Sequence, residues 1–304
     1  AFTFTADAEI SIEANPGTIS PDKLNAIRKS GINRISFGVQ SANTEELRML
    51  ERIHDFFTVI EAVSTARKAG FDNLNLDLIY GLPQQSLPTW QTTLQRIVDL
   101  HPEHISAYAL TLEHGTPFGR WSSKGLLPLP DPYLAAEMYE YAEDFLESNG
   151  YVHYEISNWA RKSKDEGERM RDEANANSSF IPHPSSFVCR HNLQYWHSLP
   201  YLAFGAGAHG YANGYRYSNA LRIKTYIERL SLPSAFSLLP FPLSPATVNQ
   251  HKQTLKDDMS EYMLNNLRLT NAGVAESDFR LRFGSGLLDV YPKEIEELIH
   301  NGLL

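Results

Sequence analysis

Short apolar runs alternate with longer segments whose apolar residues recur at helical spacing, and this unit repeats along the first half of the chain. Each short run predicts a strand, and each longer segment predicts a helix that a cap residue opens and a glycine closes. Strands separated by amphipathic helices are typical of parallel α/β folds. We therefore expect strands at residues 9–14, 34–40, 74–79, 105–110 and 151–156.

The helices between these strands have one apolar face each. Ser20-Pro21, Asn43 and Asp131-Pro132 mark helix starts, because these residue types cap a helix or fit its first turn. The positions expected to be buried are Phe56, Val59, Ile60 and Val63, then Trp90, Leu94, Ile97 and Val98, then Leu134, Met138, Tyr141 and Phe145.

Side chains alternate along the expected strands, and one side of each strand is apolar while the other is polar. The apolar side should face the helices; its members are Ile10, Ile12, Ile35, Phe37, Val39, Leu74, Leu76, Leu78, Ile105, Ala107 and Ala109. The opposite side comprises Glu9, Ser11, Glu13, Ser36, Gly38, Gln40, Asn75, Asp77, Ser106 and Tyr108. A closed barrel fills its interior with bulky apolar residues, so we expect an open or partial (β/α) barrel that holds a polar ligand. A sheet with one solvated face is the alternative.

Three polar residues of this lining lie at or near the carboxyl ends of their strands, where parallel α/β folds bind ligands. They are Glu13, Gln40 and Asp77, and Arg52 follows shortly after Gln40. Singly, each residue also fits a structural role, as a cap, a turn residue, a buried carboxylate or a surface charge. Their joint occurrence at strand ends favours a ligand site.

Several segments resemble one known family. They are Glu13-Ala14-Asn15-Pro16, Ser36-Phe37-Gly38-Val39-Gln40, Arg52-Ile53-His54, the stretch from Asp77 to Pro83, and Ser106-Ala107-Tyr108-Ala109-Leu110. Over nearly the whole chain they are similar to radical S-adenosylmethionine proteins of the oxygen-independent coproporphyrinogen III oxidase type. The resemblance implies that Glu13, Gln40, Arg52 and Asp77 contact S-adenosylmethionine in a partial barrel.

The resemblance also implies a [4Fe-4S] cluster held by a Cys-x-x-x-Cys-x-x-Cys loop, and this chain lacks that loop. Such a cluster needs several thiolates, and Cys189 is the single cysteine in the sequence. We therefore interpret the chain as a fragment that lacks the family's first two strand units, or else as a relative that has lost cluster chemistry. The chain by itself is not expected to perform radical chemistry.

A second motif, His191-Asn192-x-x-Tyr195-Trp196, resembles the branch of the family formed by heme chaperones of the HemW type. The resemblance implies that these four residues contact heme, with His191 as the candidate ligand of the heme iron. A neutral imidazole can bind heme iron, and the two aromatic rings offer a flat surface to a macrocycle. A histidine packed among aromatic residues, or Cys189 as a soft ligand, are the alternatives.

The segment Gly205-Ala206-Gly207-Ala208-His209-Gly210 fits the dinucleotide fingerprint in its letters. The fingerprint must open a helix, but turn or strand residues follow here, so we do not expect a dinucleotide site. His209 is a further candidate for contact with heme or substrate.

We expect four regions: a partial barrel at 1–160, a flexible insertion at 161–186, a capping segment with the heme motif at 187–243, and a small helical, winged-helix-like domain at 244–304. In the last, Ser244-Pro245 should open a long helix that buries Met259, Tyr262, Met263 and Leu267, followed by short helices near 278–283 and 291–300.

Charge and composition limit the kinds of partner that we expect. The net charge of −9, and Glu294, Glu296 and Glu297 on the last helix, argue against binding to nucleic acid. No apolar run approaches the ~20 residues of a membrane span, so we expect a cytoplasmic protein. Two functions are open: a heme chaperone that passes heme to unidentified acceptor proteins, and a coproporphyrinogen III oxidase that makes protoporphyrinogen IX by radical decarboxylation.

Overall fold

The structure is a computed structural model that describes residues 3–113, 116–126, 131–162, 187–231 and 239–303. The chain divides into two compact units, Ala1–Cys189 and Arg190–Leu304, and each is described here by itself. Residues 163–186, most of the expected insertion, lie outside the described part of the chain. No helix within the described ranges has the length and apolar character needed to cross a membrane.

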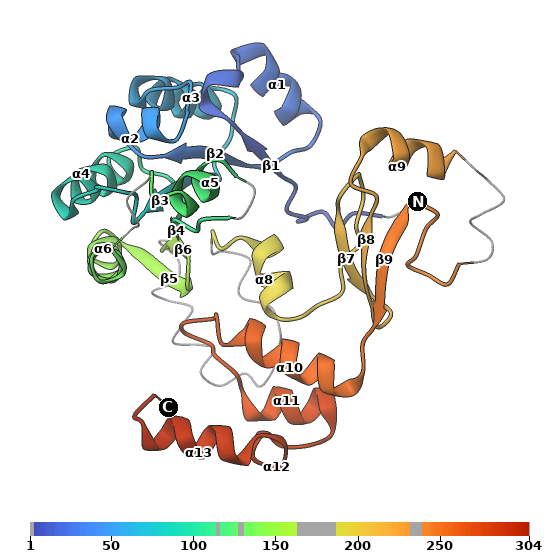
Figure 1. The fold of residues 1–304 in the computed structure, drawn as a ribbon. Coiled ribbons are helices and arrows are strands. Elements are labelled where there is room, and N and C mark those ends of the chain that lie inside the picture. Colours follow the sequence, from blue (N-terminus) through green and yellow to red (C-terminus); the bar gives the residue numbers. More distant parts are fainter. Residues whose placement is uncertain (1–2, 114–115, 127–130, 163–186, 232–238, 304) are drawn as a thin grey trace. The chain divides into compact units, whose positions relative to one another are not determined.

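The first unit is built on a six-stranded sheet with the strand order β1-β2-β3-β4-β6-β5 (Figure 1). The first four strands are parallel and lie in sequence order, as the repeated strand–helix pattern predicts. The strands are β1 (Ser11–Ala14), β2 (Arg34–Gln40), β3 (Leu74–Tyr80), β4 (His104–Ala109), β5 (Tyr151–Glu155) and β6 (Asn158–Arg161).

Helices connect these strands and cover one side of the sheet (Figure 1). Ser20, Asn43 and Asp131 cap the helices that they were expected to open, each with its side chain accepting a backbone N–H of the first turn. The elements are η1 (Pro16–Thr18), α1 (Pro21–Lys29), α2 (Thr44–Met49), α3 (Phe56–Lys68), α4 (Leu87–Val98), α5 (Pro117–Ser123) and α6 (Pro132–Ser148).

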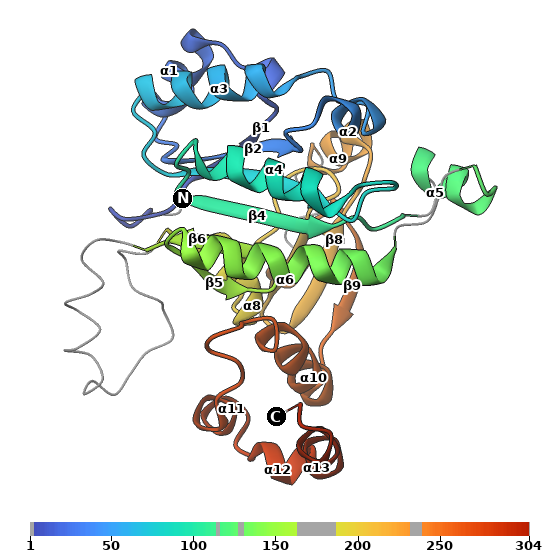
Figure 2. The same cartoon turned by 90° about the vertical axis from the view of Figure 1, so that its left-hand side faces the viewer.

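The apolar side of the strands and the inner faces of α3, α4 and α6 form one core, and α4 and α6 lie side by side in Figure 2. Phe37, Leu76 and Trp90 are fully buried in it, which confirms the expected alternation. Two residues expected in this core are exposed. Ile60 is 40% exposed because the buried stripe of α3 runs along Val59, Ala62, Val63 and Ala66. Ala109 is the last residue of β4, beyond the helical cover.

A hairpin ends the sheet and corrects the expected all-parallel arrangement. Two residues join β5 to β6, and a connection so short requires antiparallel pairing. β6 lies between β4 and β5 and pairs antiparallel with both. Trp159 of this unexpected strand is fully buried, and its ring stacks on His153 with 4.3 Å between the centroids.

The second unit contains a three-stranded antiparallel sheet that the sequence did not predict. Its third strand occupies residues where a helix beginning at Ser244-Pro245 was expected, so that helix start is wrong. The backbone groups of these residues pair with β8 instead of forming helical turns. The sheet and the helices beside it in the sequence are α8 (Arg190–Trp196), β7 (His209–Ala212), β8 (Tyr215–Asn219), α9 (Ile223–Leu230) and β9 (Thr247–Lys252).

Helices complete the second unit. Met259, Tyr262 and Phe279 form a small buried cluster, with Met263 packed against it. Leu267, which was expected to be buried, is 52% exposed because it follows the last turn of α10. The helices are α10 (Leu255–Asn266), α11 (Glu276–Phe283), α12 (Leu287–Val290) and α13 (Pro292–His300).

Candidate functional site

The polar side of the first unit's sheet carries a connected set of hydrogen bonds. Asp77 is half-buried on β3 and lies opposite Gly38 of β2 and Ser106 of β4. Its Oδ2 accepts a hydrogen bond from the Ser36 hydroxyl at 2.7 Å, and its Oδ1 accepts one from Asn75 Nδ2 at 2.7 Å. Both carboxylate oxygens are therefore held by side chains of the same sheet face.

Buried groups continue this set away from Asp77. Asn75 Oδ1 lies 2.6 Å from His104 Nδ1 and accepts a hydrogen bond from the Ser106 hydroxyl at 3.1 Å. His104 Nε2 lies 2.8 Å from the hydroxyl of Tyr154, which in turn accepts a hydrogen bond from the backbone N–H of Cys189 at 3.2 Å.

Burial determines the charge states of His104 and Tyr154. It lowers the pKa of His104 well below its ordinary value, and the positive charge of Arg34 adds to the effect. Burial raises the pKa of Tyr154 well above its ordinary value. At neutral pH, His104 is a neutral imidazole and Tyr154 is an intact phenol, so the pair forms hydrogen bonds without carrying charge.

Gln40 leaves β2 in an unusual conformation. Its φ of 71° lies in the left-handed region, and the pairing of β2 with β3 shifts register between Gly38 and Gln40. A Cβ atom at position 38 would lie 2.9 Å from Gln40 Nε2, so the amide of Gln40 folds back over Gly38. Because Gly38 pairs with Asp77, this fold brings Gln40 to the same part of the sheet face.

Glu13 and Arg52 are both exposed. Glu13 lies on β1 and pairs with Ser36 of β2. β2 separates it from β3, the strand of Asp77. Arg52 lies in the loop before α3, and His54 anchors that loop, with its Nε2 3.1 Å from the carbonyl oxygen of Val39 at the end of β2. Three predicted residues thus lie on adjacent strands, and Arg52 lies in a loop anchored to one of them.

Helix α8 carries the second predicted set, in the other unit. The ring of exposed His191 contacts Tyr195 edge-on, with centroids 4.8 Å apart, and Tyr195 contacts Tyr201 in the same way at 4.4 Å. Arg216 Nη1 donates a hydrogen bond to the Tyr201 hydroxyl at 2.8 Å. The rings of His191, Tyr195 and Tyr201 therefore form a continuous aromatic row.

Trp196 belongs to a different contact. The guanidinium of Arg268 lies 4.3 Å from the centre of the Trp196 ring, and the buried Nε1 of Trp196 has no hydrogen-bond partner among the described residues. Asn192 is half-buried on the same helix. The heme motif therefore presents His191 and Tyr195 together, while Trp196 packs against α10's C-terminal turn region through Arg268.

The glycine-rich segment before β7 leads into a strand, which confirms that it lacks the helix of a dinucleotide fingerprint. His209 begins this strand and is exposed. It lines a shallow groove of about 330 Å³ together with Tyr201, Arg216 and His251. This groove lies within the second unit.

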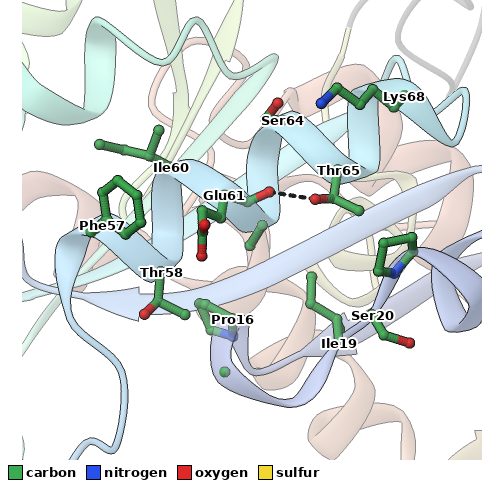
Figure 3. Close-up of a pocket in the computed structure, with 13 residues that line it drawn as sticks. Pro16, Ile19, Ser20, Phe57, Thr58, Ile60, Glu61, Ser64, Thr65 and Lys68 are labelled. Carbon is green, nitrogen blue, oxygen red and sulfur yellow. Dashed lines mark hydrogen bonds between the residues drawn. The ribbon is translucent and has the colours of Figure 1, made fainter.

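A larger groove of about 540 Å³ lies on the helical side of the first unit, between η1 and α3 (Figure 3). Pro16, Ile19, Phe57 and Ile60 are among the residues that line it. None of Glu13, Gln40, Arg52 and Asp77 is among the residues that line it.

Metal-binding chemistry is sparse in the described part of the chain. No group of three or more His, Cys, Asp or Glu side chains within it is arranged to hold a metal ion. Cys189 is a buried free thiol whose Sγ lies 3.8 Å from Glu9 Oε1.

Two features of the site could have been found from sequence patterns but were not. His104 shares the parity of Ser106 and Tyr108, so one more residue of alternation would have placed it on the polar side. Gly38 is an isolated glycine inside a strand, which is a signal for a bulge or a close approach.

Comparisons with known proteins identify the family and the fold. A model of the radical SAM superfamily matches residues 4–97, and a model of the HemN C-terminal domain matches residues 253–304. Heme chaperone HemW of Bacillus subtilis is 33% identical over 297 residues, which cover 98% of this chain and 69% of the relative. Heme chaperone HemW of Lactococcus lactis is 32% identical over 296 residues, covering 97% and 69%.

The structure of coproporphyrinogen III oxidase (HemN) from Escherichia coli, a radical SAM enzyme, superposes with a TM-score of 0.73. The match covers 98% of this chain and 63% of that one at 24% sequence identity. A likeness at this identity concerns the fold. It confirms the expected mixed α/β architecture with a parallel sheet and a helical C-terminal region.

Proposed function

The chain belongs to the HemW family of the radical SAM superfamily, and from this premise we propose that it is a heme chaperone, which binds heme and passes it to an acceptor protein. The observation that carries the proposal is the motif of α8. His191 is exposed and lies edge-on against Tyr195, which places an imidazole, a group that can bind heme iron, beside an aromatic ring. Asn192 and Trp196 complete the proposed heme contact.

We also propose that Glu13, Gln40, Arg52 and Asp77 bind S-adenosylmethionine on the polar side of the sheet. The ligand carries hydroxyl, ammonium and carboxylate groups, and this side offers two carboxylates, an amide and a guanidinium. The half-buried carboxylate of Asp77 and the bulge that directs Gln40 toward it fit such a polar ligand.

The family also implies a [4Fe-4S] cluster, and the residues of this chain do not fit one. Cluster iron is held by several thiolates, whereas the sequence has one cysteine, and Cys189 is buried. The proposed function of this chain is therefore binding of heme and of S-adenosylmethionine, with no reaction step assigned to it.

A heme titration tests the first proposal. Adding heme to the purified protein should shift the Soret band, and His191→Ala should abolish the shift. His300→Ala, at an exposed histidine of α13, is the matched control and should titrate as the wild type does. An unchanged titration of His191→Ala would remove His191 as the iron ligand.

Transfer needs a separate measurement. Heme-loaded protein is mixed with apomyoglobin as the acceptor, and the appearance of holomyoglobin is followed by absorbance. Direct transfer predicts a rate that rises with apomyoglobin concentration. A rate independent of that concentration would mean that heme first dissociates into solution, which contradicts transfer on contact.

A further inference from the structure

The carboxylate of Asp77 accepts its hydrogen bonds from residues on one side, toward the amino ends of the strands. Its two donors, Ser36 and Asn75, are paired residues on β2 and β3, and both lie nearer the amino ends of the strands than Asp77. A carboxylate can accept about four hydrogen bonds. Among the described residues only these two donate to Asp77, so two acceptor positions remain for a ligand at the carboxyl ends of the strands, where parallel sheets bind their ligands.

The amide of Asn75 has only one orientation that satisfies its surroundings. A carboxylate accepts hydrogen bonds and donates none, so Nδ2 must face Asp77, and it also donates to the Ser36 hydroxyl at 2.9 Å. Oδ1 therefore faces Ser106 and His104. It follows that His104 carries its proton on Nδ1, and Nε2 accepts the hydrogen bond of Tyr154.

We propose that Ser36 and Asn75 are positioning residues that orient Asp77 toward S-adenosylmethionine, and that His104 fixes the Asn75 amide in the orientation this requires. The inference rests on the proposed S-adenosylmethionine site. His104 and Asn75 are almost fully buried, yet the set of bonds ends at a half-buried carboxylate.

The fold itself does not explain these polar residues. The core of this unit lies on the opposite side of the same strands, where the neighbours Ile35, Leu74 and Leu76 are fully buried. Apolar residues of similar size could pack the polar side without any need for matched donors and acceptors. A set of aligned hydrogen bonds is needed where one member must keep a fixed direction for a ligand.

Calorimetric titration of S-adenosylmethionine into the purified protein tests the proposal. Ser36→Ala removes the donor to Oδ2 and should raise Kd about fivefold. Asn75→Asp keeps an acceptor for His104 but replaces the donor to Asp77 with a second carboxylate oxygen, and should raise Kd by about tenfold or more. Ser218→Ala, at a buried strand serine of the other sheet, is the matched control and should leave Kd unchanged.

A double-mutant cycle with Asp77→Ala separates positioning from a general effect on the fold. If Ser36 acts through Asp77, Ser36→Ala should have almost no further effect once Asp77 is alanine. The inference would be overturned if Ser36→Ala raised Kd by the same factor in both backgrounds, or if Ser36→Ala and Asn75→Asp left Kd unchanged. Either result would leave the proposed ligand site itself standing. Unchanged binding by Asp77→Ala, or no binding by the wild type, would instead refute the proposed S-adenosylmethionine site.

Discussion

The polar side of the six-stranded sheet and helix α8 carry the two sets of residues proposed to meet ligands, and they hold their polar atoms differently. On the sheet, Asn75 uses its carbonyl oxygen and its amino group in hydrogen bonds to neighbouring side chains. On α8, the ring of His191 is exposed, and the buried Nε1 of Trp196 has no hydrogen-bond partner in the described part of the chain. The first region holds its polar atoms in hydrogen bonds within one sheet face, whereas the second combines an exposed imidazole with a buried indole N–H.

Asn75→Leu should disrupt the hydrogen bonds of the first region, the polar side of the sheet, and we expect it to have the largest effect on stability. The leucine would remove the hydrogen-bond partner of the buried His104 N–H, of the buried Ser106 hydroxyl and of one oxygen of the half-buried Asp77. We expect a loss of about 2–4 kcal/mol in the free energy of unfolding, measured by urea denaturation. Asn249→Leu, at an exposed asparagine of β9, is the control and should cost less than about 0.5 kcal/mol. Equal losses for the two variants would contradict the comparison.

The pH dependence of stability should identify His104 as part of the first region. Its pKa is lowered in the folded protein by burial and by the charge of Arg34, so below about pH 6.5 the unfolded chain binds a proton that the folded protein excludes. Stability should therefore fall as pH decreases below that value, with a slope of at most about 1.4 kcal/mol per pH unit from this group. The contribution is fully present above that pH.

His104→Asn should remove this part of the slope in urea denaturation between pH 7.5 and 5.5, since asparagine does not titrate. His300→Asn changes an exposed histidine and should keep the wild-type slope. A slope in His104→Asn equal to that of the wild type would mean that His104 titrates alike in the folded and unfolded states.

Trp196→Phe tests the second region, helix α8, and should have the smallest effect on stability. Phenylalanine keeps a ring beneath Arg268 and removes an N–H that donates to none of the described residues, so we expect a change in stability below about 1 kcal/mol. Urea denaturation of the variant against the wild type measures it. A loss above about 2 kcal/mol would show that the indole is fixed as firmly as Asn75.

The strands and helices with a strong apolar period could be predicted from the sequence. β2 begins and ends where the alternation indicated, and all four expected residues of α4 are buried. β9 could not be predicted in this way, because most of its side chains are exposed and its sequence is polar. Its conformation depends on pairing with β8, which no local pattern contains.

For the proposed site, the sequence predicted which residues to consider but not the hydrogen bonds between them. The rule that ligands bind at strand ends brought Gln40 and Asp77 into consideration, and the structure places them on adjacent strands. The set of hydrogen bonds around Asp77 depends on side-chain conformations, and three of these bonds join residues 29 to 41 positions apart. Such contacts become visible only once the register of the strands is known.

The position of β6 between β4 and β5 also has a consequence for synthesis of the chain on the ribosome. One edge of β4 stays open until Asn158–Arg161 has emerged, long after Ala109. At about 5–20 residues per second, this interval lasts roughly 3–10 s. During that time the nascent chain exposes the unpaired backbone groups of this β4 edge, which can pair with a strand of another chain.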